Sequence, residues 1–192
     1  MKDLLIRAAI AVTFIFLFIL TLYLTVSEHK LPQQKISEAK EDISISNPLS
    51  ILSMRKRAYP GSDLLIEEEL GVGANYRQYI ASYKSDGLKI YGLLTIPTQD
   101  KPERGFPVII FNHGYIPPEE YKTTERYVAY VDGFARQGYV VFKPDYRGHG
   151  NSEGKPEGAY FSPAYTVDVL NALSSVKKLL YVNKDKIGMW GH

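Results

Sequence analysis

The chain has 192 residues, the length of one ordinary domain, and 45% of them are hydrophobic while 23% are charged. Its 23 Lys and Arg residues nearly balance 21 Asp and Glu residues, so the formal net charge is +2. A nearly neutral chain lacks the concentrated basic surface that neutralising a phosphate backbone requires, and nucleic acid is not expected as a partner. The absence of cysteine excludes disulfides, thiolate metal sites and a cysteine nucleophile.

The first feature along the chain is an uncharged apolar run over residues 8–26. As a helix it would rise about 28 Å, close to the ~30 Å hydrocarbon core of a bilayer. Apolar side chains cover every face of that helix, and its exit through Ser27 lacks the small-residue pattern of a signal-peptide cleavage site. We therefore predict residues 1–7 as a short flank and residues 8–26 as an uncleaved, single-pass membrane anchor. The shortness of the flank favours a cytoplasmic N-terminus and an extracytoplasmic domain.

Residues 27–74 form a tether and pre-domain segment between the apolar run and the first regular pattern. Residues 27–42 are rich in Lys, Glu, Gln and Ser, which predicts a solvated stretch. The basic run at residues 55–57 and the acidic run at residues 67–69 are interpreted as solvated surface, because three charges fall short of the roughly four to eight typical of a lipid-binding cluster.

From residue 75 onward the pattern is that of an α/β domain, predicted to span residues 75–192. Two alternating runs flank Asp86-Gly87, a dipeptide that accepts the positive φ angles of a tight hairpin turn. Strands then alternate with helices, which favours a largely parallel sheet covered by helices on both faces. The expected strands are residues 79–83, 88–96, 108–111, 139–142 and 187–190.

The two expected helices carry recognisable end signals. The first spans residues 124–137 and stops at Gly138, a residue suited to a left-handed cap. The second opens with Ser162 as N-cap and Pro163 in the first turn. Its buried stripe is expected to consist of Val169, Leu170, Leu173, Val176 and Leu180.

Glycine-containing motifs follow all three expected parallel strands, at the sheet edge where such folds bind ligands. Glycine allows tight turns there and lets backbone N–H groups approach a ligand. The three motifs, in chain order, are His113-Gly114, Asp145-x-Arg147-Gly148-x-Gly150-x-Ser152 and Gly191-His192. Each motif alone is ordinary turn chemistry, whereas the ordered set is specific.

That ordered set resembles the α/β-hydrolase superfamily, particularly its prolyl-oligopeptidase-like and dienelactone-hydrolase-like serine hydrolases. The resemblance covers residues 76–192 and implies the N-terminal half of an α/β-hydrolase fold, with an antiparallel hairpin leading into a mainly parallel sheet. It implies that the Tyr115 N–H is one donor of the oxyanion hole, a kind of group worth roughly 2.7–4 kcal/mol to the transition state. Tyr115 stands where many relatives have glycine, so its hydroxyl is a second candidate contact to substrate.

The resemblance also assigns roles to the charged residues and histidines of these loops. Asp145 and Arg147 are expected to hold the second loop in structural hydrogen bonds, since a guanidinium cannot act as a base. His113 and His149 are expected to be loop residues, because the general base of this superfamily lies downstream of the nucleophile.

The run over residues 187–192 matches the first half of the nucleophile elbow Gly-x-Ser-x-Gly. The resemblance places the nucleophile immediately after His192, so no residue of the catalytic triad is expected within this chain. We expect a fragment that is inactive and poorly stable as it stands. The complete protein is expected to be a membrane-anchored serine hydrolase of small ester or peptide substrates, without metal or cofactor.

Other protein classes fit the sequence less well. A membrane-tethered, non-catalytic interaction protein is the main alternative. A metal-dependent hydrolase could gather His113, His149, His192 and Asp145 at the strand ends, but the chain lacks a paired signal such as His-Glu-x-x-His. A nucleotide-binding domain is disfavoured because the glycine-rich run at residues 71–76 lacks a third glycine and precedes the sheet.

Overall fold

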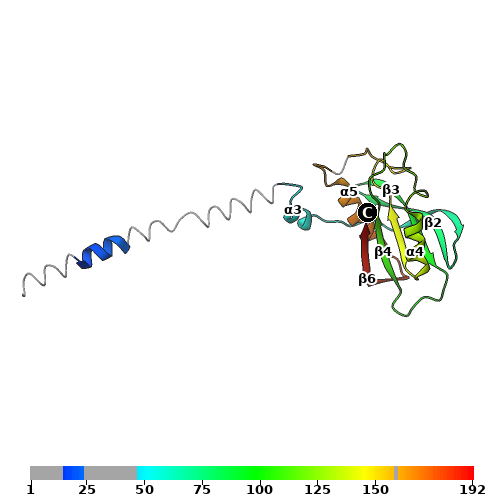
Figure 1. Cartoon of the computed structure of the whole chain (residues 1–192), viewed down its shortest axis with the longest axis horizontal. Helices are drawn as coiled ribbons and strands as arrows, with labels where there is room; N and C mark the ends of the chain where they lie inside the picture. Colours follow the sequence, from blue (N-terminus) through cyan, green and yellow to red (C-terminus); the bar gives the residue numbers. More distant parts are fainter. Residues whose placement is uncertain (1–14, 24–46, 158–159) are drawn as a thin grey trace, which may run out of the picture. The chain divides into compact units, whose positions relative to one another are not determined.

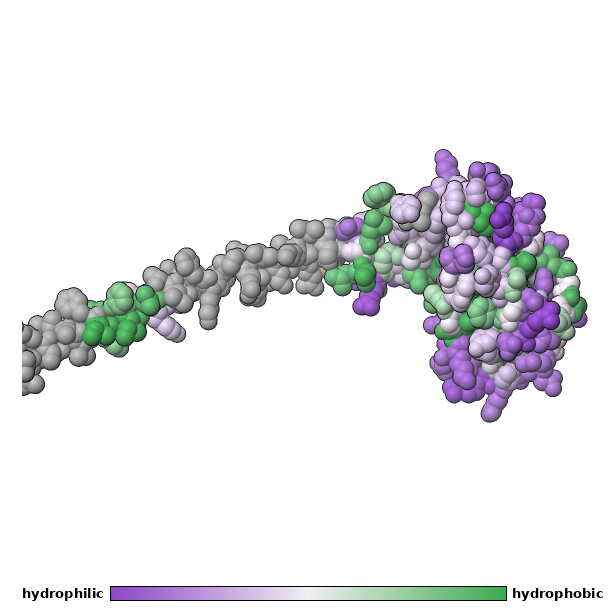
Figure 2. Space-filling view, viewed as in Figure 1, coloured by the Kyte–Doolittle hydropathy of each residue, from purple (hydrophilic) through white to green (hydrophobic). Residues whose placement is uncertain are grey.

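The computed structural model describes residues 15–23, 47–157 and 160–192, and it divides into two compact units, Met1–Met54 and Arg55–His192. In the first unit, residues 15–23 are helical, and Figure 2 shows their surface as mostly hydrophobic. Within the described ranges, no helix is long and apolar enough to cross a membrane. The remainder of the predicted anchor, the flank over residues 1–7 and the tether over residues 27–46 lie outside those ranges.

The second unit is built on a six-stranded sheet in the order β1-β2-β3-β5-β4-β6 (Figure 1). Its strands are β1 (Leu65–Val72), β2 (Tyr76–Ser85), β3 (Leu88–Pro97), β4 (Phe106–Asn112), β5 (Val140–Pro144) and β6 (Val182–Gly191). Strand β4 is parallel to both β5 and β6, whereas β1, β2, β3 and β5 pair antiparallel in succession. The sheet is therefore mixed rather than largely parallel, because a hairpin and an added edge strand make up half of it.

The hairpin forms as the sequence predicted. In the β2–β3 register Ser85 lies opposite Leu88, which leaves Asp86 and Gly87 as the two-residue turn. Their φ angles of 50° and 83° are both left-handed, as a turn between twisted strands requires.

Strand β1 lies within the stretch that the sequence pattern assigned to the pre-domain segment. Its side chains are almost all exposed, so the alternation that reveals a half-buried strand is missing. Two of its glutamates bind cations of the hairpin, Glu69 with Arg77 on the adjacent β2 and Glu67 with Lys89 on β3. The folded unit therefore begins before residue 75, because the free edge of β2 recruits a strand that has no apolar face of its own.

Two helices cover opposite faces of the sheet (Figure 1). Helix α4 (Val128–Arg136) packs on β3 and β5, and helix α5 (Ala164–Val176) packs on β2, β4 and β5. A short helix, α3 (Ile51–Lys56), precedes the sheet. Helix α4 begins later than the expected residue 124, because Tyr127 adopts a left-handed conformation with φ 58°. Its C-terminal turn ends at Gly138 with φ 85°, as predicted.

Helix α5 differs from its prediction on its buried face. Of the expected stripe, Val176 is fully buried, whereas Leu180 lies beyond the helix and is 93% exposed. The buried face also contains polar residues, Asp168, Asn171 and Ser175. The N-cap is Pro163 rather than the predicted Ser162, which lies one residue earlier and accepts a hydrogen bond from the Ala164 N–H at 3.2 Å. The apolar pattern misled here because polar groups on β2 and in the loop after β5 meet this face.

Candidate active site

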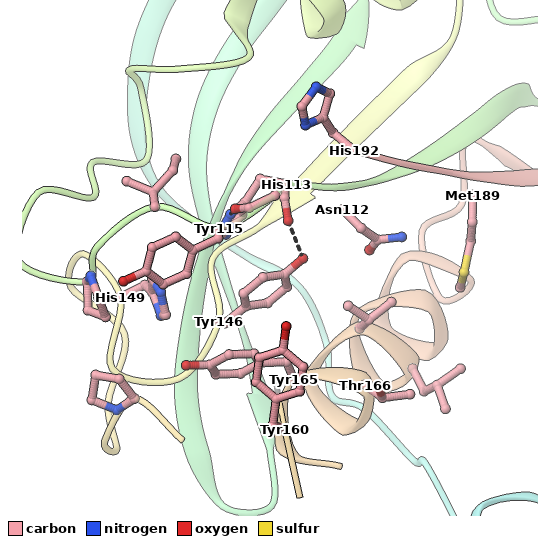
Figure 3. Close-up of a pocket in the computed structure, with 16 residues that line it drawn as sticks. Asn112, His113, Tyr115, Tyr146, His149, Tyr160, Tyr165, Thr166, Met189 and His192 are labelled. Atoms are coloured by element: carbon pink, nitrogen blue, oxygen red, sulfur yellow. Dashed lines mark hydrogen bonds between the residues drawn. The ribbon is translucent and has the colours of Figure 1, made fainter. Parts of the chain in front are cut away.

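A cavity of about 830 Å³ opens at the carboxyl ends of β4, β5 and β6 (Figure 3). The loops that follow β4 and β5, the end of β6 and the first turns of α5 all contribute to its wall. Its lining is mainly aromatic and aliphatic, and includes Tyr115, Ile116, Tyr146, Tyr160, Tyr165, Val169, Leu170 and Met189. Such a concave, mostly apolar site with a few polar groups is typical of a small-molecule binding pocket.

The first and third predicted loops lie side by side at this cavity. The His192 N–H donates to the Asn112 carbonyl at 3.2 Å, and the Tyr127 hydroxyl lies 3.3 Å from His192 Nδ1. A Cβ atom on Gly114 would lie 3.0 Å from the His192 carbonyl oxygen and 2.8 Å from the Tyr127 hydroxyl. Glycine is therefore needed at residue 114 for this close approach.

Tyr115 lines the cavity, and it is 87% exposed. Among the residues that the structure describes, none accepts a hydrogen bond from the Tyr115 N–H. An unpaired N–H at a cavity wall can donate to a developing oxyanion, which is the role that the resemblance assigned to it.

His113 is buried below the cavity between two tyrosine rings. Its ring centroid lies 4.6 Å from that of Tyr121 and 4.2 Å from that of Tyr146, both in stacked geometry. Its Nδ1 donates to the Gly114 carbonyl at 2.8 Å. Burial lowers the pKa of His113 to about 3, assisted by the positive charge of Lys143, so the ring is neutral near pH 7. An enclosed imidazole with so low a pKa binds a proton too weakly to be poised as a general base.

Asp145 is buried in a polar cluster beneath the second loop. Its two carboxylate oxygens accept hydrogen bonds from the Tyr121 and Thr123 hydroxyls, each at 2.5 Å. Burial raises the pKa of Asp145 above its usual value. Lys143 donates to the Tyr121 hydroxyl at 3.0 Å, and burial lowers the pKa of Lys143 to about 8. This cluster joins the end of β5 to the loop after β4.

Arg147 is bound by Asp168, which projects from the buried face of α5. The guanidinium Nη2 lies 2.8 Å from Asp168 Oδ1 and Nε lies 3.0 Å from Oδ2, while the Arg147 N–H also donates to Oδ2 at 3.0 Å. These hydrogen bonds raise the pKa of Arg147 further above its ordinary value. Asp145 and Arg147 both point into the scaffold rather than into the cavity.

The remaining residues of the second loop shape its backbone. Gly148 and Gly150 have φ angles of 71° and 55°, and a Cβ atom on Gly148 would lie 2.3 Å from the Pro156 nitrogen. Ser152 accepts a hydrogen bond from the Tyr91 N–H at 3.0 Å, which ties the loop to β3. His149 is buried, with Nδ1 3.2 Å from the Arg147 carbonyl. Gly191 ends β6, and a Cβ atom there would meet nothing within 4 Å.

Two functional features escaped the sequence reasoning. Tyr146 and Tyr165 stack with centroids 4.8 Å apart, which joins the second loop to the first turn of α5 at the cavity wall. Asp168 is fully buried and organises Arg147. The sequence contained an indication of each. Tyr146 lies within the second motif, and Asp168 is an acidic residue in an otherwise largely apolar helical stretch.

The geometry does not favour the metal-site alternative. His113, His149, His192 and Asp145 all lie near the strand ends, but they do not converge on one point. Within the described part of the chain, no group of three His, Cys, Asp or Glu residues is arranged to hold a metal ion.

Comparison with known proteins identifies relatives of the second unit. The sequence profile described as X-Pro dipeptidyl-peptidase (S15 family) matches residues 86–192. The uncharacterized peptidase YtmA of Bacillus subtilis (strain 168) is 31% identical over 118 residues, which cover 60% of this chain and 41% of that protein. The chain therefore spans less than half the length of this curated relative.

Solved structures with the same fold include two with low sequence identity. The hypothetical protein PA2218 from Pseudomonas aeruginosa matches with a TM-score of 0.51 and 21% identity, over 62% of this chain and 36% of that one. Acetyl xylan esterase from Paenibacillus sp. R4 matches with a TM-score of 0.50 and 20% identity, over 71% of this chain and 47% of that one. These similarities concern the fold, which is α/β-hydrolase-like as expected, although its sheet is mixed rather than largely parallel.

Proposed function

Because the chain belongs to the X-Pro dipeptidyl-peptidase (S15) family, a branch of the α/β-hydrolase serine hydrolases, we propose that the complete protein is a membrane-anchored serine hydrolase. The observation that carries this proposal is that Tyr115 and His192 line one cavity beside the carboxyl ends of β4 and β6. The nucleophilic serine is proposed to follow His192 in the complete protein.

The proposed reaction is acyl transfer. The serine Oγ attacks the substrate carbonyl carbon while a general base, from beyond residue 192, takes the hydroxyl proton. The carbonyl oxygen becomes an oxyanion, which the Tyr115 N–H stabilises. Collapse of this intermediate expels an alcohol or an amine that receives the proton, and water then hydrolyses the acyl-enzyme. Asp145 and Arg147 hold the second loop in place throughout.

Membrane anchoring through residues 8–26 is the second part of the proposal. It is supported by the uncharged apolar run and by the hydrophobic, exposed side chains of the helical residues 15–23. The short N-terminal flank favours an extracytoplasmic hydrolase domain. Fractionation of cells that express the complete protein should recover it in membranes, and deletion of residues 8–26 should release it.

Peptidase activity is favoured over esterase activity by the family match and by the peptidase relative. The fold similarity to an esterase keeps carboxylic esters as the second candidate substrate class. Hydrolysis of X-Pro p-nitroanilides and of short-chain p-nitrophenyl esters by the purified complete protein distinguishes the two.

Labelling with a fluorophosphonate probe tests the serine chemistry directly. We expect the complete protein to be labelled, and a variant with alanine at the position after His192 to lose labelling. If labelling does not depend on that serine, the function is wrong, and a non-catalytic interaction protein becomes the better assignment.

Tyr115 allows a test of the oxyanion donor with matched controls. Tyr115→Pro removes the N–H and should lower kcat about 100- to 1000-fold, the usual cost of one lost oxyanion donor. Tyr115→Ala keeps the N–H and Tyr115→Phe removes only the hydroxyl, so both should stay within about threefold of wild type if only the backbone acts. Equal losses in Tyr115→Pro and Tyr115→Ala would assign the role to the side chain.

A further inference from the structure

The turn after β4 is held at three consecutive carbonyl groups. The Asn112 carbonyl accepts from the His192 N–H at 3.2 Å. The His113 carbonyl accepts from the Tyr146 hydroxyl at 2.9 Å, the bond drawn as a dashed line in Figure 3. The Gly114 carbonyl accepts from Nδ1 of His113 at 2.8 Å. Because a carbonyl oxygen can only accept, Nδ1 must carry the ring proton.

The Gly114 carbonyl and the Tyr115 N–H belong to the same planar peptide unit. A hydrogen bond that sets the direction of the carbonyl therefore sets the direction of the N–H, which points the opposite way in that plane. The Tyr115 N–H itself has no hydrogen-bond partner among the described residues, so no other contact of that group restrains it. An oxyanion donor is effective only when it is preorganised at about 2.7–3.1 Å from the developing charge.

The His113 ring is well suited to transmit a fixed direction. It is held between Tyr121 and Tyr146 and is 4% exposed. Its Nε2 is buried and has no hydrogen-bond partner in the described structure. The ring therefore makes one directional hydrogen bond, and stacking on both faces prevents it from turning away.

We infer that His113 is a positioning residue for acyl transfer, whose Nδ1–H orients the Gly114–Tyr115 peptide so that the Tyr115 N–H faces the cavity. This role presupposes the serine-hydrolase function proposed above. In this role His113 acts through the Gly114–Tyr115 peptide and not on the reacting atoms. Its contribution is to the rate of the chemical step rather than to the binding of substrate.

Two substitutions separate the hydrogen bond from the stacking. His113→Phe keeps an aromatic ring between the tyrosines but removes the donor, whereas His113→Asn removes the ring but offers an amide N–H at the position of Nδ1. We expect His113→Phe to lower kcat about 10- to 100-fold with KM changed less than about twofold. His113→Asn should retain kcat within about threefold, although it should be less stable. A result in which His113→Asn loses as much kcat as His113→Phe, or in which His113→Phe keeps the wild-type kcat, overturns the inference.

A double-mutant cycle with Tyr115→Pro tests whether His113 acts through the peptide N–H. In a protein that already lacks this N–H, adding His113→Phe should change kcat less than about twofold. If the fold losses in kcat of the two single variants multiply in the double variant, His113 acts independently of the Tyr115 N–H, which contradicts the inference.

The ring tautomer gives a readout that does not require activity. In the complete protein labelled with 15N-histidine, the resonances lost in His113→Phe should show Nδ1 protonated and Nε2 unprotonated at neutral pH. The opposite tautomer overturns the inference even if the protein is no hydrolase. Absence of serine-dependent fluorophosphonate labelling, with the expected tautomer present, overturns the proposed function instead and leaves the hydrogen bond established.

Discussion

Helices α4 and α5 cover opposite faces of one sheet, but they do so with different chemistry. Helix α4 buries Val131 and Ala135 against an apolar cluster of strand residues. Helix α5 buries Asp168, Asn171 and Ser175 along with its apolar residues, and these polar groups are hydrogen-bonded. A helix that only excludes water from the core needs an apolar face. Helix α5 also holds the loop beside the cavity, which requires directional contacts.

An Arg–Asp pair on each side of the sheet allows a quantitative comparison: both members of one pair lie on α4, whereas α5 supplies only the aspartate of the other. The Arg136–Asp132 pair on α4 is solvent-exposed at 2.7 Å, whereas the Arg147–Asp168 pair at 2.8 Å has a fully buried carboxylate. Exposed pairs contribute about 0–1 kcal/mol, while removing one partner of a buried pair costs about 3–5 kcal/mol. The same pair of residue types is therefore expected to contribute more to stability where the carboxylate is buried than where it is exposed.

The largest expected effect is that of Asp168→Asn, because it removes the buried carboxylate and leaves the Arg147 guanidinium with only its longer contacts to Asp86 at 3.3 Å and Glu157 at 3.9 Å. We expect the free energy of unfolding of the complete protein to fall by about 3–5 kcal/mol, measured by urea denaturation. Adding Arg147→Met should restore more than half of this loss, since the unpaired charge is then absent. A fall in the free energy of unfolding below about 1 kcal/mol in the single variant would show that α5 only covers the sheet and does not hold the second loop through Arg147.

The next effect concerns His113, which the Tyr146–Tyr165 stack connects to α5. Its pKa is about 3 in the folded state and near 6.5 when unfolded, so between these values the unfolded chain binds the additional proton. Stability is therefore lost as the pH falls below 6.5, by up to about 1.4 kcal/mol per pH unit. His113→Phe should remove this pH dependence. As the pH is lowered from 7 to 4.5, the free energy of unfolding of the variant should therefore rise by about 2–3 kcal/mol relative to that of wild type.

The check on that prediction is urea denaturation of both proteins at several pH values. Asp145, whose pKa burial raises, is present in both proteins and largely cancels in the difference. A difference that does not vary with pH would mean that the His113 ring accepts a proton in the folded state as easily as in water.

A core substitution on α4 provides the apolar counterpart. Val131→Ala removes two buried methyl groups and should cost about 2 kcal/mol of unfolding free energy. No titratable group changes, so the loss should be the same at pH 7 and pH 5, and the rate of fluorophosphonate labelling should stay at the wild-type value. Slower labelling of the folded variant would indicate that α4 also positions the site.

The smallest expected effect is that of Arg136→Gln, which breaks the exposed pair on α4. We expect the free energy of unfolding to fall by less than about 0.5 kcal/mol, because water already screens the interaction. Added salt should reduce this loss further. A loss comparable to that of Asp168→Asn would remove the distinction between the two pairs.

Local sequence signals predicted those parts of the fold that depend on local chemistry. The Asp86-Gly87 turn was predictable because few dipeptides accept two left-handed residues. Strand β4 was predictable because burial on both faces demands a continuous apolar run. Strand β1 was missed because exposure on both faces leaves no such pattern.

For the candidate site, the sequence predicted which loops lie together but not the contacts that connect them. The motifs indicated that the loops bearing Tyr115 and His192 would lie together, and the structure places them side by side. The partner of Arg147 could not be read from a pattern of apolar residues, because Asp168 lies on a helix where periodicity favours aliphatic side chains at the buried positions. The stacking of His113 between Tyr121 and Tyr146 likewise joins three separate segments.

The sequence by itself determined the succession of turns, strands and helices and the residues placed at the strand ends, because backbone preferences and apolar periodicity act over a few neighbouring residues. Only the tertiary structure decided that β5 lies between β3 and β4, that α5 buries Asp168 against Arg147, and that the His113 imidazole binds the Gly114 carbonyl. The physical reason is that a polar group is buried only where a distant partner satisfies it, and the path of the chain through the sheet sets which partner that is.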